Sequence, residues 1–72
     1  MFVIYGKTSG CPSCTTAKQL LESKGIEYQF VDVLRDSHAM QLFREKGFRG
    51  VPQIYKDGEH IGNEKDLREL LK

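Results

Sequence analysis

The first half of the chain contains two short apolar runs, and between them lies a stretch whose apolar residues recur at helical spacing. Residues 2–6 are apolar and β-prone, which is typical of a strand buried on both faces. Apolar residues at helical spacing then predict a helix over residues 12–24, which Gly25 ends. A second strand is expected over residues 28–33. Strand, helix and strand within roughly thirty residues form a βαβ unit, so we expect two parallel strands joined by a right-handed crossover.

The second half of the chain predicts a helix, a hairpin and a final helix. The first of these helices is capped by Asp36 or Ser37 and ended by Gly47. The remaining expected elements are a strand over residues 53–56, a turn at Asp57-Gly58, a return strand over residues 59–61 and a helix over residues 64–71. The order β-α-β-α-β-β-α predicts an α/β fold with a four-stranded mixed sheet and three helices packed on it.

The same patterns assign side chains of the middle segment to core or surface. In the second helix, Ala39, Leu42 and Phe43 mark the inner face, and Met40 is assigned to the core. Asp32 is the one charged residue of the second apolar run. Two interpretations of Asp32 are open: a buried proton acceptor or, as we favour, a carboxylate at the strand end.

Length and composition narrow the class of protein. With 72 residues the chain is expected to form one small domain over residues 1–72. Its net charge is +1 and it has no basic block, so nucleic acid is not an expected partner. We find neither a signal peptide nor a stretch that approaches a membrane span, and we expect a cytoplasmic protein. In that compartment a lone cysteine pair is more often catalytic or metal-binding than a structural disulfide.

Cys11 and Cys14 lie where the first strand gives way to the first helix. Pro12 suits the first helical position, which makes Cys11 the N-cap. The unpaired N–H groups and partial positive charge of a helix N-terminus favour a thiolate, the form of cysteine that attacks disulfides. Cys14 shares a helical stripe with Ala17 and Leu21 that faces the sheet, so it is the more buried thiol. We therefore expect Cys11 to attack and Cys14 to resolve the mixed disulfide.

Several short motifs together resemble a small dithiol glutaredoxin over essentially the whole chain. In chain order they are Tyr5-Gly6-Lys7, Cys11-Pro12-Ser13-Cys14, Gly50-Val51-Pro52-Gln53-Ile54-Tyr55, Asp57-Gly58, His60-Ile61-Gly62 and Asp66-Leu67. The resemblance implies a thioredoxin-like fold and a thiol–disulfide oxidoreductase with glutathione as co-substrate and no tightly bound cofactor. Its implied partners are glutathione and disulfide-containing proteins, with ribonucleotide reductase as a candidate electron acceptor. We expect a monomer.

The resemblance also implies where glutathione is held. Lys7 and the backbone of Val51 and Pro52 match the family's glutathione contacts, and the family's proline is cis, a form found in only ~5–6 % of X–Pro bonds. In the family, N–H groups at the start of the last helix and an acidic side chain hold the γ-glutamyl end. The full set of expected glutathione or substrate contacts is Lys7, Pro12, Ser13, Val51, Pro52, Gly62, Asn63 and Glu64.

Three positions depart from the family pattern, and each bears on glutathione affinity. Ser13 stands where the family often has Tyr, which removes an aromatic wall beside the attacking cysteine. Asn63-Glu64-Lys65 replaces a Gly, a small or aromatic residue and an acid, so that only Glu64 supplies an acid there. Lys7 lies one residue farther from the first cysteine than usual. It is open whether Lys7 meets a substrate or is a solvated loop lysine.

Three functions are open on these grounds. The first is the glutathione-dependent oxidoreductase. The second keeps the dithiol chemistry but takes its electrons from thioredoxin reductase. Ser13 and the altered Asn63-Glu64-Lys65 segment favour it, whereas Val51-Pro52-Gln53-Ile54 favours glutathione. The third is a metal-binding or iron–sulfur module. His38 and His60 lack the spacing of a zinc site, and a proline directly after the first cysteine disfavours a shared cluster, so no metal ligand is assigned.

Overall fold

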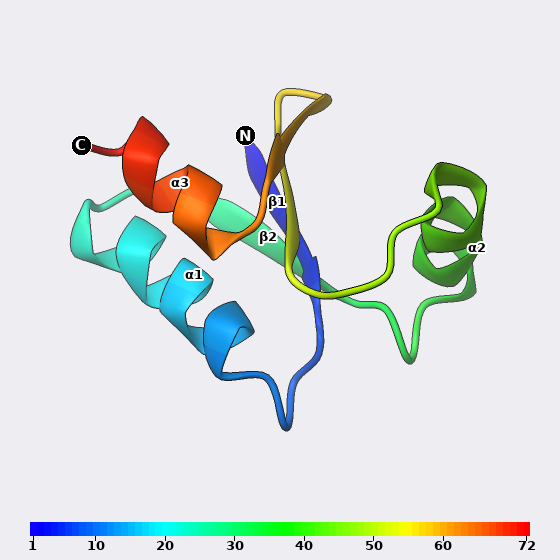
Figure 1. Ribbon diagram of the computed structural model, residues 1–72. Coiled ribbons are helices and arrows are strands. Elements are labelled where there is room, and N and C mark those ends of the chain that lie inside the picture. The colour runs from blue at the N-terminus through cyan, green and yellow to red at the C-terminus, as the bar shows by residue number, and fades with distance from the viewer.

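The computed structural model describes residues 1–72 and contains four strands and three helices (Figure 1). In chain order these are β1 (Phe2–Gly6), α1 (Pro12–Ser23), β2 (Tyr28–Asp32), α2 (Ser37–Lys46), β3 (Gln53–Lys56), β4 (Glu59–Gly62) and α3 (Glu64–Leu70). The order is the one that the sequence predicts, and the boundaries differ by one residue at the ends of α1, β2, β4 and α3. None of the helices has the length and apolar character needed to cross a membrane.

The four strands form one mixed sheet in the order β2-β1-β3-β4. β1 runs parallel to β2, with Phe2 opposite Tyr28 and Gly6 opposite Asp32. β3 is antiparallel to β1, and β4 is antiparallel to β3. The parallel pair and the hairpin confirm the predicted mixed sheet. Because β1 is an inner strand, the loop that follows it lies near the middle of one end of the sheet. This loop leads directly to the cysteine pair.

Helices α1 and α3 pack together on one face of the sheet, and α2 lies on the other side (Figure 1). The buried cluster between α1, α3 and the sheet consists of Phe2, Ile4, Ala17, Leu21, Ile54 and Leu67. Alternate residues of β1 point into this cluster because side chains of a strand alternate between its two faces. The core therefore lies on the α1/α3 side, and it fixes α1 firmly against β1.

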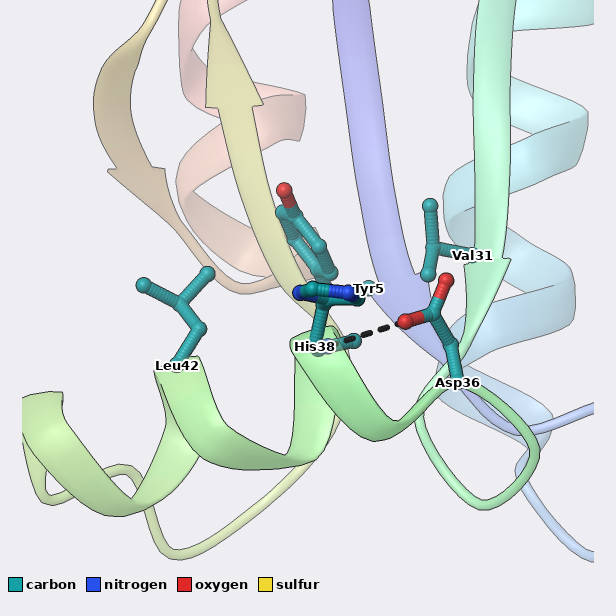
Figure 2. A pocket seen from close by; sticks show the side chains of 6 residues that line it. Tyr5, Val31, Asp36, His38 and Leu42 are labelled. Atoms are coloured by element: carbon teal, nitrogen blue, oxygen red, sulfur yellow. Dashed lines mark hydrogen bonds between the residues drawn. The ribbon is translucent and has the colours of Figure 1, made fainter.

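Helix α2 packs more loosely on the opposite face. Its one buried residue is Ala39, and a cavity of about 150 Å³ separates the helix from the sheet. Figure 2 shows this cavity, with His38 and Leu42 on the helix facing Tyr5 and Val31 on the strands. The assignment of Met40 to the core is wrong, since the residue is 37 % exposed. Met40 follows Ala39 directly, and successive helical residues point about 100° apart, so a narrow contact buries only one of them.

Helix ends follow local sequence signals. Gly25 and Gly47 adopt φ values of 69° and 70°, the left-handed conformation that ends α1 and α2. Asp36 caps α2 by accepting from the Ala39 N–H at 3.1 Å (Figure 2). Of the two candidate caps, Asp36 is therefore the one used.

Candidate active site

The cysteine pair lies at the junction of the β1–α1 loop and α1. Cys11 is the N-cap and Pro12 the first helical residue, as the sequence predicts. Cys11 and Cys14 are joined in a disulfide, with their Cα atoms 5.3 Å apart. The Cys14 side chain is completely buried, whereas Cys11 is only half-buried. The order of burial expected for the two cysteines is confirmed.

The sulfur of Cys11 accepts a hydrogen bond from the start of its own helix. The Cys14 backbone N–H donates to Cys11 Sγ over 3.2 Å. The first turn of α1 contains no acidic residue that would oppose negative charge there. A thiolate at this sulfur would keep the N–H donor and would also be stabilised by the positive end of the helix dipole.

The buried sulfur of Cys14 occupies space that a side chain on β1 would otherwise fill. A Cβ atom added at Gly6 would stand 2.7 Å from Cys14 Sγ and 3.2 Å from the Phe30 ring. The Lys18 ammonium lies over the same ring, 4.6 Å from its centre. Gly6 belongs to the motif Tyr5-Gly6-Lys7, and a glycine at the end of an apolar strand is a signal of such a close approach.

The loop before Cys11 is tied to the end of β2 through Asp32. The Thr8 hydroxyl donates to Asp32 Oδ2 at 3.1 Å, and the Leu34 N–H donates to Asp32 Oδ1 at 2.9 Å. Arg35 adds an ion pair at 3.7 Å. The Asp32 side chain is 14 % exposed and both of its oxygens have partners, so it is the strand-end carboxylate that we favoured. It anchors the loop that carries the cysteine.

A groove of about 240 Å³ opens between the loops after β1 and β2 and the segment that leads into β3. Its lining combines apolar side chains, backbone and two cations, contributed by Lys7, Val33, Leu34, Phe43, Phe48, Arg49, Gly50 and Val51. Neither Lys7 nor Arg49 takes part in an ion pair. We call this the Lys7–Arg49 groove. Of the expected glutathione contacts, Lys7 and Val51 line this groove. Arg49 lines it as well, although the sequence alone does not decide whether Arg49 meets a substrate.

The proline after the groove has the expected geometry. The Val51–Pro52 peptide bond is cis, and the Pro52 side chain is buried. Figure 1 shows that the first turn of α1, the loop after β1 and the segment leading into β3 lie at the same end of the sheet. The cis peptide and the cysteine pair thus share one end of the molecule.

The other expected glutathione contacts lie outside the groove. Pro12 and Ser13 belong to the first turn of α1, and Gly62 pairs with Ile54 in the sheet. None of these residues lines the Lys7–Arg49 groove.

The start of α3 is occupied by its own side chains. Asn63 Oδ1 accepts from the N–H groups of Lys65 at 3.0 Å and Asp66 at 3.2 Å. In return, Asp66 Oδ2 accepts from the Asn63 N–H at 3.0 Å, which completes a capping box. Asn63 and Asp66 have the three-residue spacing of a capping box, so the sequence carried a signal for this bond. Glu64 is half-buried beside it.

Residues that are not among the expected glutathione contacts hold one wall of the groove in place. The imidazole of His60 stacks on Phe48 with ring centres 4.9 Å apart. His60 Nε2 lies 2.8 Å from Gln53 Oε1, and Gln53 Nε2 donates to the Gly50 carbonyl at 3.1 Å. The hairpin residue His60 therefore holds the segment that forms one wall of the groove. His38 lies on α2 and is exposed, and no group of three or more possible metal-ligating side chains is present.

Comparisons with known sequences identify the family. The family model described as Glutaredoxin matches residues 2–61. Glutaredoxin 3 of Escherichia coli (strain K12) is 40% identical over 70 residues, covering 93% of this chain and 81% of the relative. Hybrid peroxiredoxin hyPrx5 of Haemophilus influenzae is 37% identical over 62 residues, covering 86% of this chain but only 26% of that protein.

Solved structures share the fold. A buckwheat glutaredoxin–glutathione complex has a TM-score of 0.79 at 32% identity, covering 94% of this chain and 64% of that chain. The NrdH-redoxin of Escherichia coli has a TM-score of 0.82 at 21% identity, covering 97% of this chain and 88% of that chain, and it shows likeness of fold alone. Because the family model covers most of the sequence and glutaredoxin 3 matches it over nearly its whole length, the chain belongs to the glutaredoxin family and is a thiol–disulfide oxidoreductase.

Proposed function

We propose that this glutaredoxin reduces protein disulfides and glutathione mixed disulfides, with glutathione as its electron source. The observation that carries the proposal is the Cys14 N–H directed at Cys11 Sγ over 3.2 Å. A donor and a partial positive charge at that sulfur favour its thiolate.

In this proposal Cys11 is the nucleophile and Cys14 the resolving thiol, in line with their unequal burial. The Cys11 thiolate attacks one sulfur of the substrate disulfide, forms a mixed disulfide and displaces the other substrate sulfur as a thiolate. Deprotonated Cys14 then attacks Cys11 Sγ, which closes the internal disulfide and releases the first substrate sulfur. One glutathione thiolate reopens this disulfide at Cys11, and a second attacks the bound glutathione sulfur. The products are the dithiol protein and glutathione disulfide.

Glutathione is proposed to lie across Cys11 with its peptide backbone against Val51 and Pro52. Lys7 would meet a carboxylate at one end, while Gly62, Asn63 and Glu64 would meet the γ-glutamyl end. Pro12 and Ser13 would flank the sulfur. The position of Lys7 and Val51 on one groove supports the first part of this arrangement. The buckwheat glutaredoxin–glutathione complex, at 32% identity, supports glutathione as the co-substrate.

The test is turnover of 2-hydroxyethyl disulfide with glutathione, coupled to glutathione reductase and NADPH. We expect turnover by the unaltered chain and a loss of at least about a hundredfold in Cys11→Ser, which lacks the nucleophile. Cys14→Ser should keep this activity, because a second glutathione can resolve the mixed disulfide, and should lose the reduction of protein disulfides. Absence of glutathione-dependent turnover in the unaltered protein would refute the proposal.

One observation favours thioredoxin reductase as a second candidate electron source. Asn63 already occupies the N–H groups of Lys65 and Asp66, which the resemblance would leave for the γ-glutamyl carboxylate. The E. coli NrdH-redoxin shares the fold, and its structure is described as a basis for a thioredoxin-like activity profile.

The Asn63→Gly variant separates the two candidates. Glycine is tolerated at an N-cap and frees these N–H groups, at a cost of only a few tenths of a kcal/mol of helix stability. If glutathione is the natural reductant but Asn63 weakens its binding, Asn63→Gly should lower the KM for glutathione severalfold. If thioredoxin reductase is the reductant, it should reduce the unaltered protein with NADPH and no glutathione.

Ribonucleotide reductase as acceptor, a cytoplasmic location and a monomeric state complete the proposal.

A further inference from the structure

The Lys7–Arg49 groove has apolar side chains in its lining that glutathione would leave uncovered. Leu34 stands at the groove as a residue that is 65 % exposed, and Phe43 and Phe48 are only half-buried beside it. The free energy falls when another apolar side chain covers exposed leucine and phenylalanine surface. Glutathione has carboxylates but no apolar side chain, so it cannot supply that cover.

The charged side chains that line the groove are all positive. Lys7 and Arg49 line it, no carboxylate does, and neither cation is neutralised by an ion pair elsewhere. Two unpaired cations beside apolar walls favour a ligand that brings both a carboxylate and an apolar group.

The groove also lies within reach of the nucleophile. Lys7 precedes Cys11 by four residues. An extended chain covers at most ~3.6 Å per residue, so the two Cα atoms lie within about 14 Å. A substrate side chain two to four residues from the attacked cysteine therefore spans this distance.

We infer that the Lys7–Arg49 groove is a specificity site for protein disulfides that carry an acidic and an apolar side chain two to four residues from the attacked cysteine. The inference rests on the proposed role of Cys11 as the nucleophile. The chemistry is unchanged: Cys11 forms the mixed disulfide, and the displaced sulfur leaves as a thiolate. The groove binds the flanking residues and leaves the bond-breaking step to the cysteines.

The test uses three heptapeptides whose central cysteine is activated as a 2-pyridyl disulfide. Their sequences are Glu-Leu-Ser-Cys-Ser-Leu-Glu, Lys-Leu-Ser-Cys-Ser-Leu-Lys and Glu-Ser-Ser-Cys-Ser-Ser-Glu. The flanks are symmetric, so the direction in which the peptide binds does not matter. The dithiol protein attacks the peptide sulfur and releases pyridine-2-thione, whose absorbance gives a second-order rate constant without glutathione.

We expect the acidic, leucine-containing peptide to react about fivefold faster than each of the other two, as expected for one exposed ion pair or one partly buried side chain. Arg49→Gln should reduce the preference for the acidic peptide, and Leu34→Ser should reduce the preference for leucine. Both are exposed loop positions. Because each preference is a ratio within one protein, a general change in thiol reactivity cancels.

Matched controls make the same changes outside the groove. Arg44→Gln and Leu70→Ser alter exposed residues that do not line it, and both preferences should remain. Equal rates for all three peptides, or an equal loss of charge preference in Arg44→Gln and Arg49→Gln, would overturn the inference. The 2-pyridyl disulfide of 2-mercaptoethanol tests the proposed function separately: if Cys11→Ser reacts with it as fast as the unaltered protein, the role of Cys11 is wrong whatever the peptides show.

Discussion

Gly6 ends β1 at the point where the buried sulfur of Cys14 needs room. Any side chain there would bring a Cβ atom to 2.7 Å from Cys14 Sγ, closer than real contacts allow, with the Phe30 ring behind it. Close packing leaves no free volume to absorb such a clash, so either the strand or the helix has to move. This single position therefore couples the geometry of the sheet to that of the resolving thiol.

Replacing Gly6 by Ala should lower the free energy of unfolding by about 1–3 kcal/mol, which is typical of overpacking in a core. Urea unfolding of the dithiol form measures it. Gly50→Ala is the matched control, because a Cβ atom at Gly50 meets nothing within 4 Å, and it should change stability little. In a double-mutant cycle, Cys14→Ala should relieve most of the Gly6→Ala penalty. If the penalty persists without the sulfur, the clash is not its cause.

Tyr28 provides a pH-dependent contact at the other end of α1. Its hydroxyl donates to Glu22 at 2.5 Å, and this bond, with burial and the negative charge of Glu22, raises the pKa of Tyr28 to about 12. A raised pKa means that the contact stabilises the fold fully below about pH 10 and loses this effect as pH rises towards 12.

Tyrosinate absorbance should therefore show one late ionisation near pH 12, provided that the fold persists to that pH. Tyr28→Phe should remove that step, which assigns it. Glu22→Ala should move it towards lower pH, because both the acceptor and the negative charge are lost. A late step that stays in place in Glu22→Ala would contradict the assigned cause.

At the scale of elements, the hairpin holds the segment before β3 through side chains. Gln53 Nε2 donates to the Gly50 carbonyl, so Gln53 Oε1 is left as the acceptor for His60. His60 Nε2 must then carry the hydrogen, and it does so in the neutral ring with that tautomer and in the protonated ring alike. The bond is thus compatible with both charge states, while the ring keeps its stacking on Phe48.

Gln53→Leu should loosen this segment without unfolding the sheet. We expect the amide hydrogens of residues 48–50 to exchange several-fold faster, since the loss of about 0.5–1.5 kcal/mol per hydrogen bond is local. The ¹⁵N chemical shifts of His60 should also lose the signature of a fixed Nε2–H tautomer. Gln29→Leu changes an exposed residue of β2 and should do neither. Equal exchange rates in the two variants would show that His60 and Gln53 do not support the segment.

Elements with local signals could be predicted from the sequence. Pro12 at a first helical position, the left-handed Gly25 and Gly47, and the Asp57-Gly58 turn each depend on a few neighbouring residues. The burial of Cys14 follows from helical spacing alone, and the cis state of Pro52 was expected only from the family resemblance. These features need no knowledge of how distant segments meet.

Contacts between distant segments could not be predicted in the same way. The stacking of His60 on Phe48 and the bond from Thr8 to Asp32 depend on loop paths and strand register. An apolar residue such as Met40 in an amphipathic helix predicts a core position, but the contact of α2 with the sheet is too narrow to cover it. The Lys7–Arg49 groove likewise exists only once three loops are brought to one end of the sheet.

For the molecule as a whole, the two faces of the sheet are covered unequally. On one face α1 alone contributes Cys14, Ala17 and Leu21 to the buried residues, whereas on the other α2 contributes only Ala39 and leaves a cavity of about 150 Å³ (Figure 2). Segments with few buried apolar contacts open at a lower free energy than the core. We therefore expect α2 to open locally while α1, α3 and the sheet stay folded.

Hydrogen exchange followed by mass spectrometry tests this, with α2 amides expected to exchange at least about tenfold faster than those of α1. Leu42→Ala, on the half-buried face of α2, should speed exchange in α2 alone, because removing a partly covered side chain costs only about 1 kcal/mol there. Leu21→Ala, in the fully buried cluster, should cost ~2–5 kcal/mol and speed exchange throughout the molecule. If Leu42→Ala accelerated α1 as much as α2, the two faces would be one cooperative unit.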